Sequence, residues 1–292
     1  MVGDLIEWGE KRLAEAGVFF GHGTDCALDE AAFLVLTALG LPLGTVGAGL
    51  KRVVSEEQRK NVSCLVEQRI ETRQPAAYLV HEAWFGGLPF YVDERVLVPR
   101  SPIAELIGSR FAPWFSKREG LRILDLGTGS GCIAVACALA FPDSRIDATD
   151  VSQDALQVAR INVQRHGLEH RVRLHESDVF AALPQHAYDI IVSNPPYVPE
   201  PEIKKLPPEY LAEPKLGLAG GGDGLQIVRR LLAQSASYLA EAGLLIAEVG
   251  HQEKRLQQAY PNVPFLWLEL ERGGEGVFLL EGSELRRHFP HL

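Results

Sequence analysis

The tetrapeptide Asn194-Pro195-Pro196-Tyr197 has residue types suited to holding a planar amine, and it ends an apolar, strand-like run over residues 188–193. The Asn194 side-chain oxygen and the Pro195 carbonyl can each accept one N–H of an NH₂ group. The two prolines fix φ and remove competing donors. Tyr197 offers a flat face that can stack on an amide and favour a nearby cation. We expect these four residues to form the catalytic site, although alone they could equally make a rigid turn.

A glycine-rich segment lies upstream, at residues 125–131, between a strand-like and a helix-like run. Glycines there let the backbone turn sharply and approach a ligand closely. A nicotinamide or flavin dinucleotide fold shares such loops, but its last glycine would fall at Cys132. The observed spacing suits a cofactor that has an ammonium and a carboxylate in place of a pyrophosphate. The expected cofactor-binding residues of this segment are Asp125, Gly127, Thr128, Gly129 and Gly131.

Acidic residues end the next two strand-like runs. Asp150 follows the second run, where a carboxylate can accept from both ribose hydroxyls. Asp178 ends the third; it can accept from an adenine amine while the Val179 N–H meets the ring, or it can simply be solvated. We expect Asn194 to lie beside this cofactor as well. The combination predicts methyl transfer from S-adenosyl-L-methionine to an amide or exocyclic amino nitrogen.

The elements that position these groups change character along the chain. Residues 1–80 have helical periodicity and predict a separate helical substrate-recognition domain. Residues 81–101 predict a β-hairpin linker, and residues 102–292 the catalytic domain. Strand-like and helical runs alternate from about residue 120, which predicts a parallel sheet covered by helices. The expected strands are 121–126, 145–149, 171–175, 188–193 and 244–248, and the expected helices are 132–140, 154–166 and 225–239.

The end of the chain departs from this alternation. Residues 265–270 and 277–280 are two strand-like runs joined by a glycine-rich turn over residues 272–276. An antiparallel hairpin that ends a parallel sheet is typical of class I S-adenosylmethionine-dependent methyltransferases. The predicted fold class is therefore α/β and Rossmann-like, with seven strands and a small N-terminal helical domain.

Composition limits the partners. The 292 residues carry a net charge of −9, with a pI near 5.5. Bulk charge therefore argues against a nucleic-acid substrate and favours a basic protein, although mild acidity can also serve solubility alone. The four cysteines form no C-x-x-C pair and the histidines are scattered, so we expect free thiols and no metal. With no signal-peptide pattern and no membrane-length apolar run, we expect a soluble, cytoplasmic protein that does not contact membranes.

With both motifs placed, the chain resembles the HemK-type glutamine N5-methyltransferases, which share N-P-P-Y with adenine-N6 DNA methyltransferases. The resemblance covers nearly all of the chain. Further matching segments are Phe90-Tyr91-Val92, Val96-Leu97-Val98-Pro99-Arg100, Glu213-Pro214 with Leu218, and Gly220-Gly221-Gly222-Asp223-Gly224-Leu225. It implies that a glutamine side-chain amide in a protein is the methyl acceptor.

One departure within this family is informative. Release-factor enzymes follow the Pro-Arg step with Pro-Glu-Thr-Glu, whereas residues 101–105 here read Ser-Pro-Ile-Ala-Glu. Together with residues 84–89 and 21–25, this form is similar to the branch that acts on the large-subunit ribosomal protein L-three. The resemblance also implies that Arg100 and Phe90 contact the substrate and cap the site.

Three other functions stay open from the sequence. Release factors could be the methylated proteins. An adenine-N6 methyltransferase would use the same tetrapeptide on a flipped base. A scaffold that binds cofactor without turnover is a third, which intact Asn194 and Tyr197 argue against.

Overall fold

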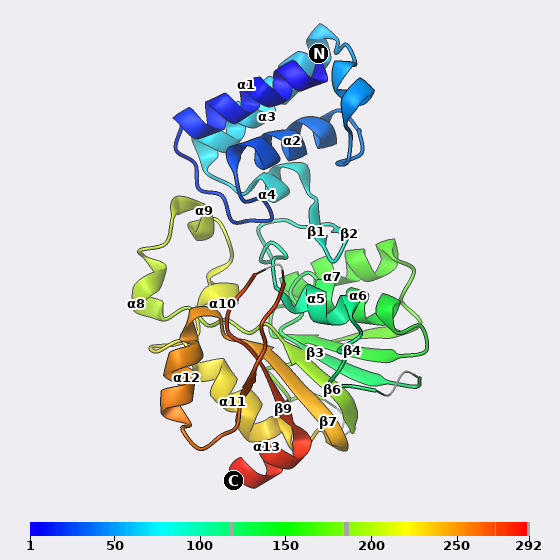
Figure 1. The fold of residues 1–292 in the computed structure, drawn as a ribbon, viewed down its shortest axis with the longest axis vertical. Coiled ribbons are helices and arrows are strands. Elements are labelled where there is room, and N and C mark those ends of the chain that lie inside the picture. The colour runs from blue at the N-terminus through cyan, green and yellow to red at the C-terminus, as the bar shows by residue number, and fades with distance from the viewer. Residues whose placement is uncertain (117–118, 184–186, 272, 291–292) are drawn as a thin grey trace.

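The protein folds as a layer of helices above a sheet that is covered by helices on both faces (Figure 1). The structure, a computed structural model, describes residues 1–116, 119–183, 187–271 and 273–290. No helix among these residues is long and apolar enough to cross a membrane.

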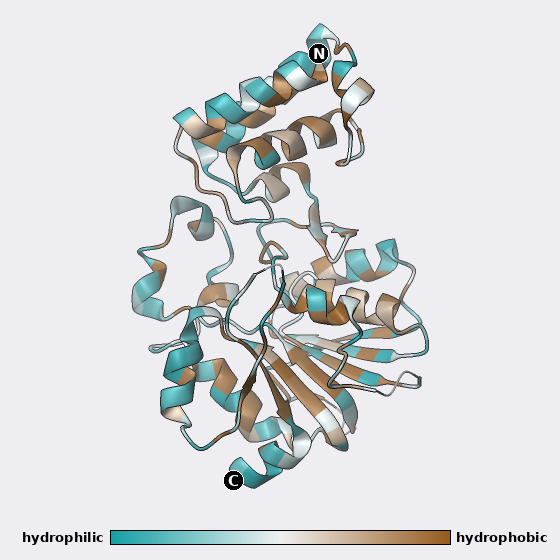
Figure 2. Ribbon diagram, viewed as in Figure 1, coloured by the Kyte–Doolittle hydropathy of each residue, from teal (hydrophilic) through white to brown (hydrophobic). Residues whose placement is uncertain are grey.

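The N-terminal layer has its own apolar core. Its elements are α1 (Val2–Glu15), α2 (Ala27–Ala38), η1 (Gly47–Lys51), α3 (Glu56–Thr72) and α4 (Ala76–Val80). Leu5, Leu34 and Val66 meet at the centre of this core, and the outer face of α1 is largely hydrophilic (Figure 2). Ser55 caps α3, since its Oγ accepts from the Gln58 N–H at 3.1 Å. The division of the chain at residues 80 and 101 stays a prediction.

A short hairpin connects this layer to the sheet. Strands β1 (Ala83–Phe85) and β2 (Leu88–Phe90) pair antiparallel. The hairpin linker was predicted over residues 81–101, but within it residues 91–99 form no strand. Val96 and Val98 are buried there because they pack beneath the hairpin with Tyr78 and Val158.

The main sheet has seven strands in the order β5-β4-β3-β6-β7-β9-β8. The first five are parallel, and β9 pairs antiparallel with both β7 and β8. These strands are β3 (Arg122–Leu126), β4 (Arg145–Asp150), β5 (Val172–Glu176), β6 (Tyr188–Ser193), β7 (Leu239–Glu248), β8 (Leu266–Trp267) and β9 (Val277–Glu281). The predicted fold class is confirmed, including the terminal hairpin, whose turn residue 272 lies outside the described residues.

Both faces of the sheet are buried because alternate residues enter different apolar cores. Ile123 and Ile190 point into one core, while Leu124 and Ile191 point into the other. The first core includes α5 (Ile103–Gly108) and α6 (Cys132–Ala140), beside α7 (Gln153–Arg165). The second includes α11 (Gln226–Ser235), α12 (Glu253–Ala259) and α13 (Gly282–His288). Successive strands start at the middle of the sheet and wind outward, so β3 and β6 are neighbours whose following segments diverge. A ligand cleft is expected at such a point.

The segment between β6 and α11 contains short helices that the sequence patterns did not predict. They are α8 (Glu200–Ile203), α9 (Pro208–Leu211) and α10 (Lys215–Leu218). Prolines 199, 207 and 214 stand directly before them, at the N-cap positions. Pro207 and Pro214 also disfavour helical backbone in the residue that precedes each, so α8 and α9 cannot continue far. The 3-10 turn η2 (Gly250–Gln252) and α12 were also not predicted.

Candidate active site

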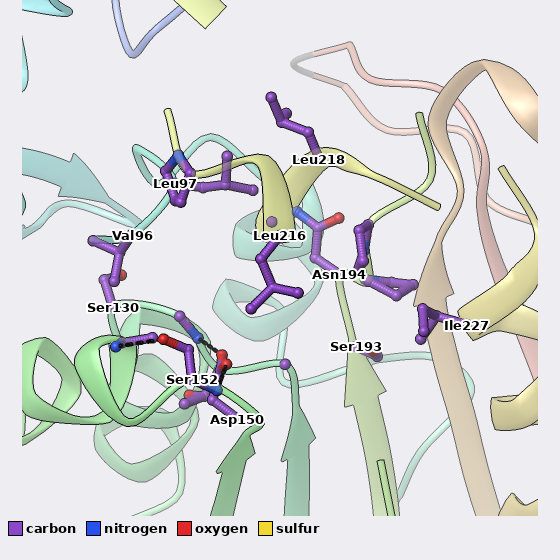
Figure 3. A pocket seen from close by; sticks show the side chains of 18 of the residues that line it. Val96, Leu97, Ser130, Asp150, Ser152, Ser193, Asn194, Leu216, Leu218 and Ile227 are labelled. Carbon is purple, nitrogen blue, oxygen red and sulfur yellow. Dashed lines mark hydrogen bonds between the residues drawn. The ribbon is translucent and has the colours of Figure 1, made fainter. Parts of the chain in front are cut away.

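A cavity of about 600 Å³ opens at the carboxyl ends of the parallel strands, where β3 and β6 diverge. Figure 3 shows Asp150 and Ser152 on one side of it and Ser193 and Asn194 on the other. Leu216 of α10 lies between these two sides. The cavity therefore brings together the ends of β3, β4, β5 and β6, as the sequence predicted.

The glycine-rich loop forms one wall of the cavity. Gly127, Thr128 and Gly129 line it, and both glycines have the left-handed conformation, with φ of 71° and 53°. A Cβ added at either glycine would meet no atom within 4 Å, so they face open space. Gly131 does not line the cavity, and its expected contact with cofactor stays a prediction. An added Cβ there would lie 3.2 Å from the Ala159 Cβ, so Gly131 serves the close packing of α7.

Asp125, which was also expected to bind cofactor, lies behind this loop and not in the cavity wall. Its side chain is fully buried, and Oδ2 accepts from the Thr128 hydroxyl at 2.6 Å and from the Ala134 N–H at 3.1 Å. Burial raises the pKa of Asp125 to about 7. The carboxyl group therefore fixes the loop to the start of α6, and it leaves Oδ1 buried with no partner among the described residues.

Asp150 lines the cavity at the end of β4, in the position expected for it. Its Oδ2 accepts from the Gly129 N–H and its Oδ1 from the Ser152 N–H, both at 2.9 Å. Burial raises the pKa of Asp150, and these N–H groups partly oppose that rise. Each carboxylate oxygen has a second lone pair, so the group can still accept from a diol in the cavity.

Asp178 and Val179 also line the cavity, just beyond the end of β5. The Asp178 carboxylate accepts from Arg230 Nη1 at 2.7 Å, a hydrogen bond that lowers its pKa. Val179 has a positive φ of 56°. This conformation is uncommon for a β-branched residue and points to a constrained turn.

The tetrapeptide continues directly from β6 into the opposite wall, and all four of its residues line the cavity. The Ser193 hydroxyl donates to the Leu126 carbonyl at 2.7 Å, which ties the end of β6 to the glycine-rich loop. On the far side, the Val198 N–H donates to Leu218 and the Gly220 N–H donates to Val198. An added Cβ at Gly220 would lie 2.7 Å from the Pro196 oxygen, so only glycine lets the two segments approach this closely.

Tyr197 is held by residues that the sequence analysis missed. Its hydroxyl donates to Glu248 Oε1 at 2.9 Å, and the Ser101 hydroxyl donates to Glu248 Oε2 at 2.6 Å. Glu248 is buried at the end of β7, where an acidic residue after an apolar run was the available signal. Ser101 was noted only as part of a family pattern.

Arg100 lines the cavity, but its charge is already paired. Nη1 and Nη2 contact the two oxygens of Glu213 at 2.6 and 2.8 Å, and the guanidinium lies over the Tyr210 ring. Burial alone would raise the pKa of Glu213, but the charge of Arg100, its hydrogen bonds and the His22 imidazole, whose Nε2 lies 3.4 Å from Oε2, hold it at about 2. The pair joins the wall at residues 98–100 to the segment before α10.

Phe90, which was expected to contact substrate, does not line the cavity. Its ring is fully buried in the core between the hairpin and α6, beside Phe85 and His166. An aromatic residue at the end of a short hairpin anchors the hairpin here by packing.

Comparisons with known proteins agree with this geometry. The methyltransferase small domain family matches residues 107–223. The ribosomal protein uL3 glutamine methyltransferase of Neisseria meningitidis serogroup B is 48% identical over 97% of this chain and 93% of its own length. That of Neisseria gonorrhoeae is 47% identical over 97% of this chain and 94% of its own length. The chain belongs to the family of these ribosomal protein uL3 glutamine methyltransferases.

The family resemblance and the predicted methyltransferase activity are thereby confirmed. A solved methyltransferase from Pyrococcus furiosus has 21% identity and a TM-score of 0.50, over 67% of this chain and 89% of that one. This likeness concerns the fold alone, and it agrees with the order of the strands.

The residues present fit the methyl donor that such enzymes require. Gly127 and Gly129 leave open space beside their backbone, and Asp150 keeps acceptor capacity within the same cavity. The apolar side chains of Leu97, Leu216 and Ile227 supply walls for an aromatic ring (Figure 3). The cavity therefore combines a few oriented polar groups with an apolar lining.

Proposed function

We propose that the protein transfers a methyl group from S-adenosyl-L-methionine to the side-chain amide nitrogen of a glutamine in ribosomal protein uL3. The single observation that carries this proposal is that the tetrapeptide and the glycine-rich loop line one cavity. An acceptor and a methyl donor held by these two walls would face each other.

Asn194 and Pro195 hold the acceptor nitrogen in this proposal. The Asn194 side chain lies in the cavity (Figure 3), and its oxygen and the Pro195 carbonyl accept the two N–H groups of the glutamine amide. An amide lone pair is delocalised into its carbonyl, so alignment of that pair must be imposed by the site. Because each of the two acceptors takes one N–H of the same nitrogen, the site selects a primary amide over a hydroxyl or an already alkylated nitrogen. The nitrogen–methyl bond would form as the sulfur–methyl bond of the donor breaks, which leaves a neutral thioether, and the nitrogen would release one proton to solvent.

The donor is held by Gly127, Thr128, Gly129 and Asp150, with Asp178 and Val179 near the adenine. When bound, S-adenosylmethionine supplies an electrophilic methyl group on a sulfonium sulfur. Asp150 orients the ribose, and the Val179 backbone lies where it can meet the ring. Tyr197 presents its aromatic ring to the positive charge of the site.

The substrate is a basic protein in this proposal, and the reaction takes place in the cytoplasm. The net charge of −9 favours such a partner. The curated relatives that cover 97% of this chain carry the name of uL3 glutamine methyltransferase, which supports uL3 over other proteins. We propose that the helical layer of residues 1–80 recognises the protein around the glutamine.

The test measures transfer from tritiated S-adenosylmethionine to uL3, with a release factor and double-stranded DNA as separate alternative substrates. We expect uL3 to be labelled and mass spectrometry to locate the methyl group on one glutamine. Asn194→Ala should lower kcat by about 10²–10³-fold, since it removes an oriented acceptor that acts in the transition state. The affinity for S-adenosylhomocysteine should stay within threefold.

Asn61→Ala is the matched control, because Asn61 is exposed on α3 and far from the cavity lining. Labelling of the release factor or DNA in preference to uL3 would refute the proposed substrate. Equal loss of cofactor binding in Asn194→Ala would show that the role of Asn194 is misassigned.

A further inference from the structure

Glu248 is a buried carboxylate whose hydrogen-bond partners are two neutral hydroxyls. Its side chain accepts from Tyr197 Oη at 2.9 Å through Oε1 and from Ser101 Oγ at 2.6 Å through Oε2. The residue is only 5% exposed, and it does not line the cavity. Glu248 thus lies behind Tyr197, on the side away from the ligands.

Burying the Glu248 carboxylate in this way costs desolvation free energy. A buried charge is costly unless it is paired, and hydroxyls offset its desolvation only in part. The charge of Arg100 helps, but the guanidinium itself contacts Glu213. Burial raises the pKa of Glu248, as expected for a carboxylate that has lost its hydration. Packing alone does not require a charge at this position, so the carboxylate needs a different explanation.

The backbone around Glu248 is fixed, so its carboxylate is a rigid anchor. Glu248 ends β7 and pairs in register with Val277 of β9, and the following Val249 N–H donates to the Gly276 carbonyl at 2.7 Å. The second hydroxyl is fixed as well, because Ser101 Oγ accepts from the Ile103 N–H at 3.3 Å, at the start of α5.

The same segment also contacts the Tyr197 ring. Gly250 has a φ of 48°, and an added Cβ there would lie 2.7 Å from Cε2 and 2.9 Å from Cζ of Tyr197. The ring edge therefore rests on the backbone two residues after Glu248. Burial and the neighbouring carboxylate both raise the pKa of Tyr197, so its hydroxyl keeps its proton and acts as the donor.

We propose that Glu248, held by Ser101, is a positioning residue that sets the plane of the Tyr197 ring for methyl transfer. The carboxylate fixes the hydroxyl and increases electron density in the ring, which favours the cation that the ring faces. This inference rests on the proposed function for its chemistry. It assigns to Ser101 and Glu248 a role through Tyr197 and no contact with substrate.

The kinetic test uses Glu248→Gln, Tyr197→Phe and the double variant, each assayed for methylation of uL3. Gln has nearly the shape of Glu, and either hydroxyl can turn to accept from its amide, so the fold should persist. We expect each single variant to lower kcat about 10- to 100-fold, with KM for both substrates within threefold. The double variant should be no slower than Tyr197→Phe, since Glu248 acts only through the hydroxyl that Phe lacks. Multiplied losses, or an unchanged kcat in Glu248→Gln, overturn the proposal.

The structural test needs no substrate and so separates this inference from the proposed function. In crystals of Glu248→Ala, both acceptor oxygens are absent, and we expect the Tyr197 ring to shift or to occupy several positions. A ring as ordered and as placed as in the wild type refutes the positioning role, whatever the wild type methylates. Conversely, a displaced ring in an enzyme that leaves uL3 unlabelled keeps this inference and refutes the proposed substrate. Glu241→Gln, exposed on the same strand, is the control expected to change neither readout.

Discussion

Asp150→Asn is expected to weaken cofactor binding, for a reason that the hydrogen bonds make quantitative. The wild-type carboxylate accepts from the Gly129 N–H and from the Ser152 N–H, both at 2.9 Å. An amide has a single acceptor oxygen, so its NH₂ must face one of these two N–H groups. The variant therefore loses one anchor of the loop and one acceptor for the ribose.

A hydrogen bond to a charged group contributes about 1.5–3 kcal/mol. Loss of one such bond on binding corresponds to a Kd for S-adenosylhomocysteine that is about 10- to 150-fold higher. Isothermal titration calorimetry at pH 8 measures this change directly. At saturating S-adenosylmethionine, kcat should fall much less, because Asp150 does not contact the amide.

The pH dependence gives a second readout of the same residue. Burial raises the pKa of Asp150, so its protonation begins at a higher pH than for an ordinary aspartate. Wild-type affinity should therefore fall as pH is lowered through that pKa, while the variant should lack this dependence. Asp143→Asn is the matched control, since Asp143 is exposed and does not line the cavity. A Kd within threefold of the wild type for Asp150→Asn would refute the assignment.

Three further predictions concern stability and loop geometry. The folded-state pKa of Asp125 is raised to about 7, so the folded protein binds more protons than the unfolded chain between about pH 4 and 7. The unfolding free energy of the wild type should fall as pH rises through this window, by on the order of 4 kcal/mol. Urea unfolding of Asp125→Asn should show no such fall. Arg69→Met should lower the unfolding free energy by about 3–5 kcal/mol, because it leaves the buried Glu30 carboxylate without its arginine and Glu209 with Arg73 alone. Gly220→Ala should lower kcat at least about tenfold with cofactor affinity retained, because its Cβ would displace the tetrapeptide backbone.

Each of these has a control variant or an outcome that would contradict it. A parallel pH slope in Asp125→Asn would show that other carboxyl groups cause the effect. Arg59→Met, exposed on the same helix as Arg69, should change stability by less than about 0.5 kcal/mol. Gly222→Ala adds a Cβ that meets no atom within 4 Å, so its activity should match the wild type. Equal activities of the two glycine variants would contradict the close-approach argument.

The parts of the fold that the sequence predicted are those set by local pattern. Strand β6 and helix α6 were predicted with their observed bounds, because apolar runs of characteristic length end at clear turn residues. Strand β7 begins at Leu239, earlier than expected, because Leu239 pairs with Tyr188 of β6. The residues between Leu239 and Leu244 carry no apolar run that would have indicated a strand. The short helices after β6 were missed because no periodicity can show in four residues.

The predicted site residues divide into those that line the cavity and those that lie behind it. Asp150 and the tetrapeptide were placed correctly in the cavity wall, since strand ends in a parallel sheet share one edge. Asp125 and Gly131 belong to the same motif but face away from the cavity. A motif records which residues a loop needs, and it does not separate those that contact a ligand from those that hold the loop.

The residues that no local pattern could supply are the partners of the site residues. Ser101 and Glu248 are 147 positions apart, and Tyr197 and Glu248 are 51 apart. Their contact exists because the segment before α5 and the segment after β6 both reach the end of β7, a consequence of strand order. Identical ligand-facing residues on a sheet with a different order would lack that contact. The tetrapeptide therefore specifies which atoms meet the amide, and the sheet specifies how firmly the aromatic ring beside it is held.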